Sequence, residues 1–168
     1  LMRERTAAMP FADKIAGVLA EKDPGDADTY RANAKAFATK LEALAQTEAQ
    51  IKTKDSGKGV AITEPVPDYL LEACGLVVKT PEAFSEAIEE DSDVSPTVLN
   101  QTLALFSQKQ VAALVYNEQT AGPQTEQALK AAKAAGVPVV PVTETLPTGK
   151  AYLSWMQGNL SAVESAPG

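Results

Sequence analysis

The spacing of apolar side chains changes once along the chain, near residue 58. Before that point they recur every three or four positions, first over residues 9–20 and then over residues 27–54, which predicts two α-helices. The turn residues Asp23-Pro24-Gly25-Asp26 separate the two patterns. The second helix would be far longer than the usual three or four turns. Its single apolar stripe, without sustained heptads, favours a strut between two bodies over a coiled coil.

After residue 58, short apolar runs alternate with helical patterns. Strands are predicted over residues 59–63, 76–79, 111–116 and 137–142, and helices over residues 66–74, 81–90, 96–108, 125–135 and 150–164. This alternation indicates a parallel sheet with right-handed crossovers. Pro138 and Pro141 put the last strand near an edge or limit its pairing. We expect a three-layer α/β/α lobe with a mostly parallel four-stranded sheet, preceded by a long linking helix.

The composition excludes several classes of function. Lysine and arginine number 15 against 22 aspartates and glutamates, a net charge of -7, so no basic face for nucleic acid is expected. Histidine is absent, which rules out a Ser-His-Asp or Cys-His mechanism within this chain. Cys74 is the single cysteine, so no internal disulfide forms. Its helical setting predicts a small buried hydrophobe.

Polar side chains follow three of the predicted strands. Glu64 comes after VAIT, Asn117 and Glu118 come after VAALVY, and Thr143 and Glu144 come after the last strand. The carboxyl ends of parallel strands share one edge of a sheet, where open α/β sheets bind their ligands. Carboxylates that meet there would repel each other unless a cation binds between them. The alternative is that each acid complements the positive end of the following helix; both interpretations remain open.

No nucleotide-binding pattern is present. Neither G-x-G-x-x-G nor G-x-x-x-x-G-K-[ST] follows a predicted strand, so a phosphate cradle is not expected. An enzyme on a Rossmann-like sheet stays a second hypothesis, with Glu64 and Glu144 as acid and base or as ligands of a catalytic Mg²⁺. No feature requires it, because nothing marks either acid for a raised pKa. We therefore favour a binding protein without catalytic activity.

Three segments resemble one family of receptors. DKIAGVLAEKDPGDADTYRANAKAFATKLEAL resembles the interdomain segment of the zinc- and manganese-type solute-binding proteins of ABC importers (cluster A-I), in which Asp23-Pro24, Tyr30 and Asn33-Ala34 match the pattern. ITEPVPDYLLEACGL is similar to the first strand and helix of that family's C-terminal lobe. LVYNEQTAGPQTEQALKAAKAAGVPVVPVTETLPTGKAYLSWMQGNL looks like its closing half. The likeness covers essentially the whole chain.

The resemblance implies a metal site. Members bind one divalent ion, zinc or manganese, in a cleft between two lobes, usually with two histidines from the N-terminal lobe. The C-terminal lobe supplies a His or Glu after its first strand, which falls on Glu64, and an acid after its last strand, which falls on Glu144. Glu118 and Asn117 are secondary candidates, since Glu118 matches a common loop acid rather than a ligand.

The chain departs from the family in lacking histidine. By this alignment the second histidine would lie at or just before Leu1. We therefore expect a fragment with half of the metal cleft: a remnant helix of the N-terminal lobe (1–24), the interdomain linking helix (25–56) and the C-terminal lobe (57–168). A glutamate stands at position 144, where the family normally has the shorter aspartate.

The resemblance also implies a location and partners. The whole receptor would be extracytoplasmic, either periplasmic or a cell-surface lipoprotein of the cell-adhesion type, and would hand its metal to a membrane permease. No signal peptide is recognisable in LMRERTAAMPFADKIA. Apolar residues such as Phe11 and Ile15 would be exposed without the N-terminal lobe, so a homodimer through these helices is a further expectation. A third hypothesis is an interaction domain that keeps the receptor fold without the metal site.

Overall fold

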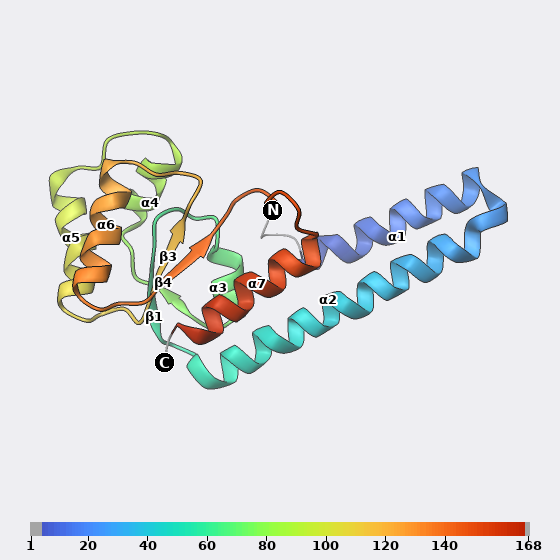
Figure 1. The fold of residues 1–168 in the computed structure, drawn as a ribbon, viewed down its shortest axis with the longest axis horizontal. Helices are drawn as coiled ribbons and strands as arrows, with labels where there is room; N and C mark the ends of the chain where they lie inside the picture. The colour runs from blue at the N-terminus through green and yellow to red at the C-terminus, as the bar shows by residue number, and fades with distance from the viewer. Residues whose placement is uncertain (1–4, 167–168) are drawn as a thin grey trace.

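The structure is a computed structural model that describes residues 5–166. An antiparallel pair of helices projects from an α/β lobe (Figure 1). Helix α1 spans Arg5–Lys22 and helix α2 spans Ala27–Asp55, with a short 3-10 turn, Pro24–Asp26, between them. The position that the resemblance gives to a second histidine, at or before Leu1, lies outside the described residues.

Helix α2 is the long helix that the apolar stripe predicted. It has 29 residues and ends at Asp55. Its first half runs beside α1, and its second half runs beside α7 (Tyr152–Ser165), as Figure 1 shows. Leu41, Leu44 and Ile51 are buried in the core cluster that also contains side chains of α7. One end of α2 is thus part of the lobe, while the other end stands clear of it.

The sheet has four strands in the order β2-β1-β3-β4. They are β1 (Gly59–Ile62), β2 (Val77–Val78), β3 (Leu114–Asn117) and β4 (Val139–Val142). Every neighbouring pair is parallel, which confirms the predicted α/β class and the four-stranded sheet. Strand β4 lies at an edge, in agreement with Pro141 within it, because proline has no N–H to donate to a further strand.

Helices cover both faces of the sheet. They are α3 (Asp68–Ala73) and α7, beside α2, and on the opposite face α4 (Glu82–Glu89), α5 (Pro96–Ser107) and α6 (Pro123–Ala134) (Figure 1). Successive residues of β1 alternate between the two cores, with Val60 and Ile62 in one and Ala61 in the other. The three layers agree with the expected architecture.

Helices α3 and α7 each begin two residues later than predicted, for local reasons. Helix α3 begins at Asp68 rather than at residue 66, because Pro67 occupies its N-cap position. Helix α7 begins at Tyr152 rather than at residue 150, because the Ala151 N–H donates to the Ser154 Oγ, at 3.2 Å, and caps the helix there. Neither change alters which residues face the cores.

The single cysteine is structural. Cys74 is fully buried, and burial, with a smaller contribution from Glu48, raises the pKa of its thiol to about 12. The thiol is therefore protonated and unreactive at neutral pH, as the sequence indicated. Between residues 5 and 166, no helix combines the length and the apolar character that crossing a membrane requires.

Candidate functional site

Glu64 lies at the carboxyl edge of the sheet, two residues after the end of β1. Its side chain is buried, with an exposed fraction of 5%. The Glu64 Oε2 accepts a hydrogen bond from the Asn117 Nδ2 and another from the Thr120 Oγ1, the latter at 2.9 Å. Both donors come from β3 and the loop after it. The carboxylate is therefore held across the sheet by the neighbouring strand, and Pro67 rather than Glu64 occupies the N-cap position of α3.

Asn117 is the residue that fixes this contact. It is almost fully buried at the end of β3, and its backbone N–H donates to the Thr63 Oγ1 at 3.0 Å. Its Oδ1 accepts the Gln119 N–H at 3.0 Å, and its Nδ2 also donates to the Thr120 Oγ1 at 2.6 Å. Since the carbonyl oxygen is already occupied, the amide nitrogen must face the Glu64 carboxylate.

Glu144 is exposed in the turn that follows β4. The Gln119 Oε1 accepts the backbone N–H groups of Glu144 and Thr145 at 2.9 and 3.0 Å, and the Gln119 Nε2 donates to the Thr145 Oγ1 at 2.8 Å. Immediately before this turn, the Trp155 Nε1 donates to the Thr143 Oγ1 at 3.0 Å. The loop after β3 thus contacts both predicted ligand positions, through different side chains.

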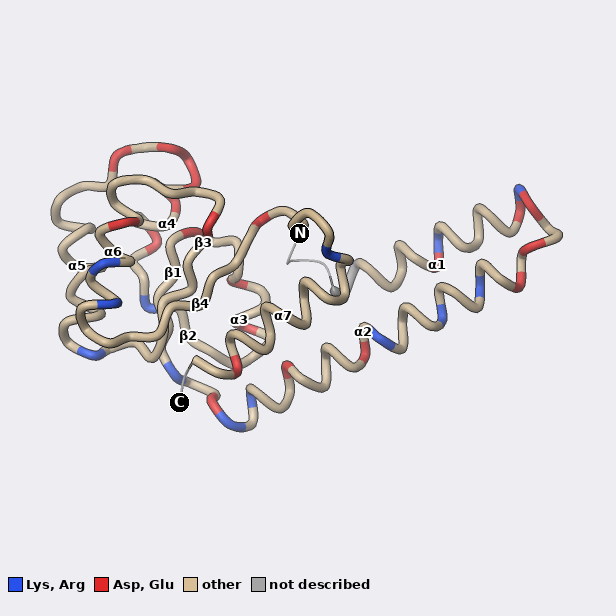
Figure 2. Tube along the Cα trace, in the orientation of Figure 1, with Lys and Arg blue, Asp and Glu red and all other residues tan. Residues whose placement is uncertain are grey.

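An acidic hollow of about 570 Å³ lies beside this edge. It is lined by Pro65, Val66, Asp68, Tyr69, Glu72, Glu89 and Glu144. Burial, followed by the charges of Glu89 and Glu72, raises the pKa of Asp68. Figure 2 shows further acidic positions in the loop after α4, on the side of the lobe toward which β3 points. The local field at this edge is therefore negative, which favours cations over anions.

The predicted site residues are only partly brought together. Glu64 and Asn117 are in contact, and Glu144 borders a hollow with Pro65 and Val66, which follow Glu64 in the chain. Glu118 is exposed, and its backbone N–H donates to the Val142 carbonyl at 3.0 Å, which continues the pairing of β3 with β4.

No group of three or more His, Cys, Asp or Glu side chains is arranged to hold a metal ion within residues 5–166. The assignment of Glu64 and Glu144 as ligands therefore stays a prediction. Sequence reasoning gave Gln119 and Thr120 no role in the site, although both belong to the YN-Q-T pattern that resembles one branch of the family.

Solved structures with the same fold include a protein in complex with Mn²⁺ and an adhesin with metal-transporting activity. A crystal structure of ZnuA has a TM-score of 0.71 at 20% identity, over 99% of this chain and 60% of that chain. The laminin-binding protein Lmb of Streptococcus agalactiae, described as bifunctional with adhesin and metal-transporting activity, has a TM-score of 0.70 at 25% identity, over 92% and 58%. FpvC of Pseudomonas aeruginosa, in complex with Mn²⁺, has a TM-score of 0.62 at 25% identity, over 90% and 56%.

The chain thus spans 60% or less of the length of these three proteins. No curated protein sequence matches it significantly. The family described as the periplasmic component A of the zinc-uptake complex, ZnuA, matches residues 5–166. That match covers nearly the whole chain and agrees with the fold, so the protein belongs to the ZnuA family of metal-binding solute-binding proteins.

Proposed function

We propose that this chain is part of the extracytoplasmic solute-binding component of an ABC importer for zinc or manganese. The family match over residues 5–166 carries the proposal. It is supported by Lmb, described as having metal-transporting activity, by FpvC in complex with Mn²⁺, and by the negative field at the carboxyl edge. The metal is the cargo of such a receptor, so no catalytic activity is proposed.

Glu64 and Glu144 are the ligands that we propose within this chain. Carboxylate oxygens suit hard and borderline divalent cations. The two hydrogen bonds on the Glu64 Oε2 hold this carboxylate in one orientation, and Glu144 is exposed and free to turn toward an ion. Two carboxylates alone bind such an ion weakly, because a closed coordination sphere requires further ligands. We propose that the remaining ligands come from outside the described residues.

The long helix and the location follow from the same proposal. Helix α2 would link this lobe to an N-terminal lobe, with α1 as the last helix of that lobe, in line with the divisions 1–24, 25–56 and 57–168. The partner would be a membrane permease, which receives the ion at the outer face of the membrane. Without the N-terminal lobe, self-association through the exposed face of α1 is the outcome that we propose.

Calorimetric titration of Zn²⁺ and of Mn²⁺ tests the ligand assignment. We expect tight binding by the full-length protein that carries this chain, weak binding by the chain alone, and loss of binding on combining Glu64→Ala with Glu144→Ala. The matched control combines Glu21→Ala with Glu42→Ala, which removes the same charge from exposed positions on α1 and α2. Undiminished affinity in the first variant would contradict the metal site and favour an interaction domain that keeps only the fold.

A further inference from the structure

We propose that Gln119 is a positioning residue, which sets the place of Glu144 relative to Glu64 by tying their two loops together. This inference rests on the proposed metal site, and it assigns a role to a side chain that would not itself touch the ion. The segment from Asn117 to Thr120 would then act as one unit that orients both carboxylates.

The Gln119 side chain holds the turn that carries Glu144. Glu144, Thr145 and Leu146 are all exposed, so packing does little to hold this turn in place. Its two successive backbone N–H groups converge on a single atom, the Gln119 Oε1, at 2.9 and 3.0 Å. The Gln119 Nε2 donates a third hydrogen bond, to the Thr145 Oγ1, at 2.8 Å. Three hydrogen bonds from one side chain therefore fix a turn that burial leaves free.

The segment from Asn117 to Thr120 also contacts the Glu64 carboxylate. The Gln119 backbone N–H donates to the Oδ1 of Asn117, whose amide nitrogen donates to Glu64. Thr120, the next residue along, donates to the same Glu64 oxygen. A displacement of Gln119 would therefore move the turn that carries Glu144 and also the donors that bind the Glu64 carboxylate.

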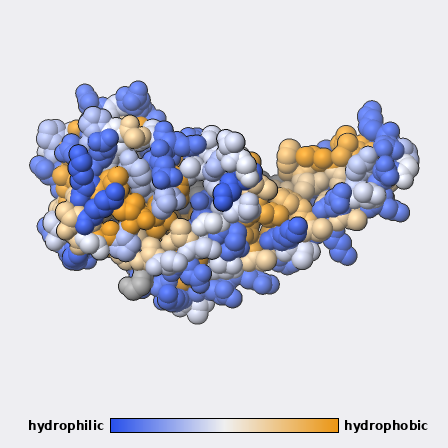
Figure 3. Space-filling model, viewed as in Figure 1, coloured by the Kyte–Doolittle hydropathy of each residue, from blue (hydrophilic) through white to orange (hydrophobic). Residues whose placement is uncertain are grey.

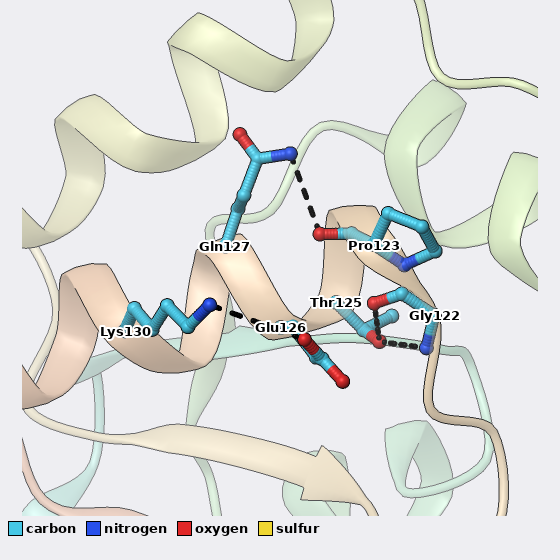
Figure 4. A network of polar contacts seen from close by, with 6 residues as sticks. All are labelled: Gly122, Pro123, Thr125, Glu126, Gln127 and Lys130. Carbon is cyan, nitrogen blue, oxygen red and sulfur yellow. Dashed lines mark hydrogen bonds and ion pairs between the residues drawn. The ribbon is translucent and has the colours of Figure 1, made fainter.

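The segment from Asn117 to Thr120 is anchored on both sides. On one side, Asn117 pairs in register with Val142 of β4. On the other side, the segment leads into α6, where the Gly122 N–H donates to the Thr125 Oγ1 at 2.9 Å, as Figure 4 shows. Thr125 is itself almost fully buried. The backbone that carries Gln119 is therefore anchored both to the sheet and to the start of α6.

The expected effect follows from how strictly metals select geometry. Zinc–oxygen bonds lie within about 2.0–2.2 Å, and a binding site tolerates misplacement of about 0.5 Å. Residues that orient metal ligands without touching the ion contribute about 10- to 100-fold in affinity. Removing the Gln119 tether should therefore weaken metal binding by such a factor while the fold remains intact, because Gln119 is exposed.

The test uses three single variants of the full-length protein. Gln119→Met keeps the length of the side chain and loses all three hydrogen bonds. Gln119→Glu keeps an oxygen acceptor for the two backbone N–H groups. Gln127→Met is the matched control, since the Gln127 amide donates to the Pro123 carbonyl on its own helix, at 3.3 Å (Figure 4). Zn²⁺ affinity is measured by calorimetry, and ligand geometry by the visible absorption of bound Co²⁺.

We expect Gln119→Met to weaken Zn²⁺ binding about 10- to 100-fold and to change the Co²⁺ spectrum, Gln119→Glu to restore most of both, and Gln127→Met to change neither. If combining Glu64→Ala with Glu144→Ala abolishes binding but Gln119→Met leaves affinity and spectrum unchanged, the positioning role is wrong and the metal site stands. If that double variant binds like the wild type, the metal site is wrong, and the positioning role with it. Equal losses in the Met and Glu variants would also overturn the positioning role.

Discussion

At the scale of single residues, the carboxyl edge of the sheet combines two kinds of acid. Glu64 is buried and satisfied by donors from Asn117 and Thr120. Asp68 is only half-buried, and its Oδ1 is enclosed without a hydrogen-bond partner among the described residues. An enclosed carboxylate oxygen without a donor is destabilised in its charged form. Glu64 thus has hydrogen-bond donors for its buried carboxylate, whereas the charged form of Asp68 raises the free energy of the folded state at neutral pH.

The raised pKa of Asp68 predicts that Asp68→Asn stabilises the folded protein, by an amount that depends on the pH. Burial first, and then Glu89 and Glu72, raise this pKa above its ordinary value of 3.8. The folded protein therefore binds more protons than the unfolded chain between 3.8 and the raised pKa, so stability falls as the pH rises through that window, and the deficit persists above it.

Thermal unfolding at a series of pH values measures this effect. Asp68→Asn should melt at a higher temperature than the wild type near neutral pH, and the difference should shrink as the pH falls below the ordinary carboxyl pKa of about 3.9. Glu42→Gln, which removes one negative charge at an exposed position on α2, serves as the control. A constant difference at every pH would show that the titration of Asp68 is not its cause.

Sequence reasoning reached part of the site and missed part of it, for a physical reason. Glu64 and Asn117 follow buried strands, and strand ends must share one edge of a parallel sheet, so their proximity was predictable. Gln119 and Thr120 lie in a loop without periodicity. Their contacts depend on the register between β3 and β4, in which Asn117 stands opposite Val142, and no local pattern encodes that register.

At the scale of elements, α2 belongs to two packing environments. Toward its end, Leu41, Leu44 and Ile51 are buried against the lobe, whereas toward its beginning it is covered by α1 alone (Figure 1). Three of its threonines, Thr39, Thr47 and Thr53, bond back to the helix itself, as the Thr39 Oγ1 donates to the Lys35 carbonyl at 3.1 Å. Exposed hydroxyls are thus satisfied without a neighbour.

The turn that joins α3 to β2 depends on a glycine, which predicts opposite effects for two alanine substitutions. Gly75 has a φ of +71°, and a Cβ there would lie 2.7 Å from the Lys52 Cγ on α2. Gly75→Ala should lower the free energy of unfolding by about 1–2 kcal/mol, the cost of a left-handed conformation with a side chain. Gly17→Ala, inside α1 with nothing within 4 Å, should raise it by about 0.5–1 kcal/mol.

Chemical denaturation of the two variants beside the wild type measures both effects. Equal destabilisation by Gly75→Ala and Gly17→Ala would show that the backbone conformation at position 75 does not matter.

The elements themselves were predicted from periodicity, because each buries one face. Their boundaries were less accurate, since proline and capping contacts decide them, as Pro67 does at α3.

At the scale of the whole molecule, the surface is unevenly apolar. Met9, Phe11, Ile15, Val18 and Leu19 of α1 are all exposed by more than 40%, and Phe11 by 68%. A hollow of about 680 Å³ between α1 and α2 is lined mainly by apolar side chains, and Figure 3 shows hydrophobic surface on this helix pair. Such a surface is typical of an interface, in accord with the proposed second lobe or, in its absence, a second copy of the chain.

Self-association of the 168-residue chain is the corresponding prediction. We expect sedimentation velocity to show a dimer whose population rises with concentration. Combining Phe11→Ser with Ile15→Ser should shift the chain toward monomer with little change in melting temperature, because both side chains are exposed. Lys14→Ser is the control for the helix propensity of serine. A wild-type chain that stays monomeric at every concentration would contradict the prediction.

The unbroken length of α2 has a mechanical consequence. With 29 residues at ~1.5 Å each, it is about 43 Å long, and no proline interrupts it to act as a hinge. A lever of that stiffness transmits rotation instead of absorbing it. Only about 21 Å of it, before Leu41, stands clear of the lobe. Each degree of tilt at that point would move the far tip by about 0.4 Å, so whatever body sits at the tip would swing with the lobe rather than independently of it.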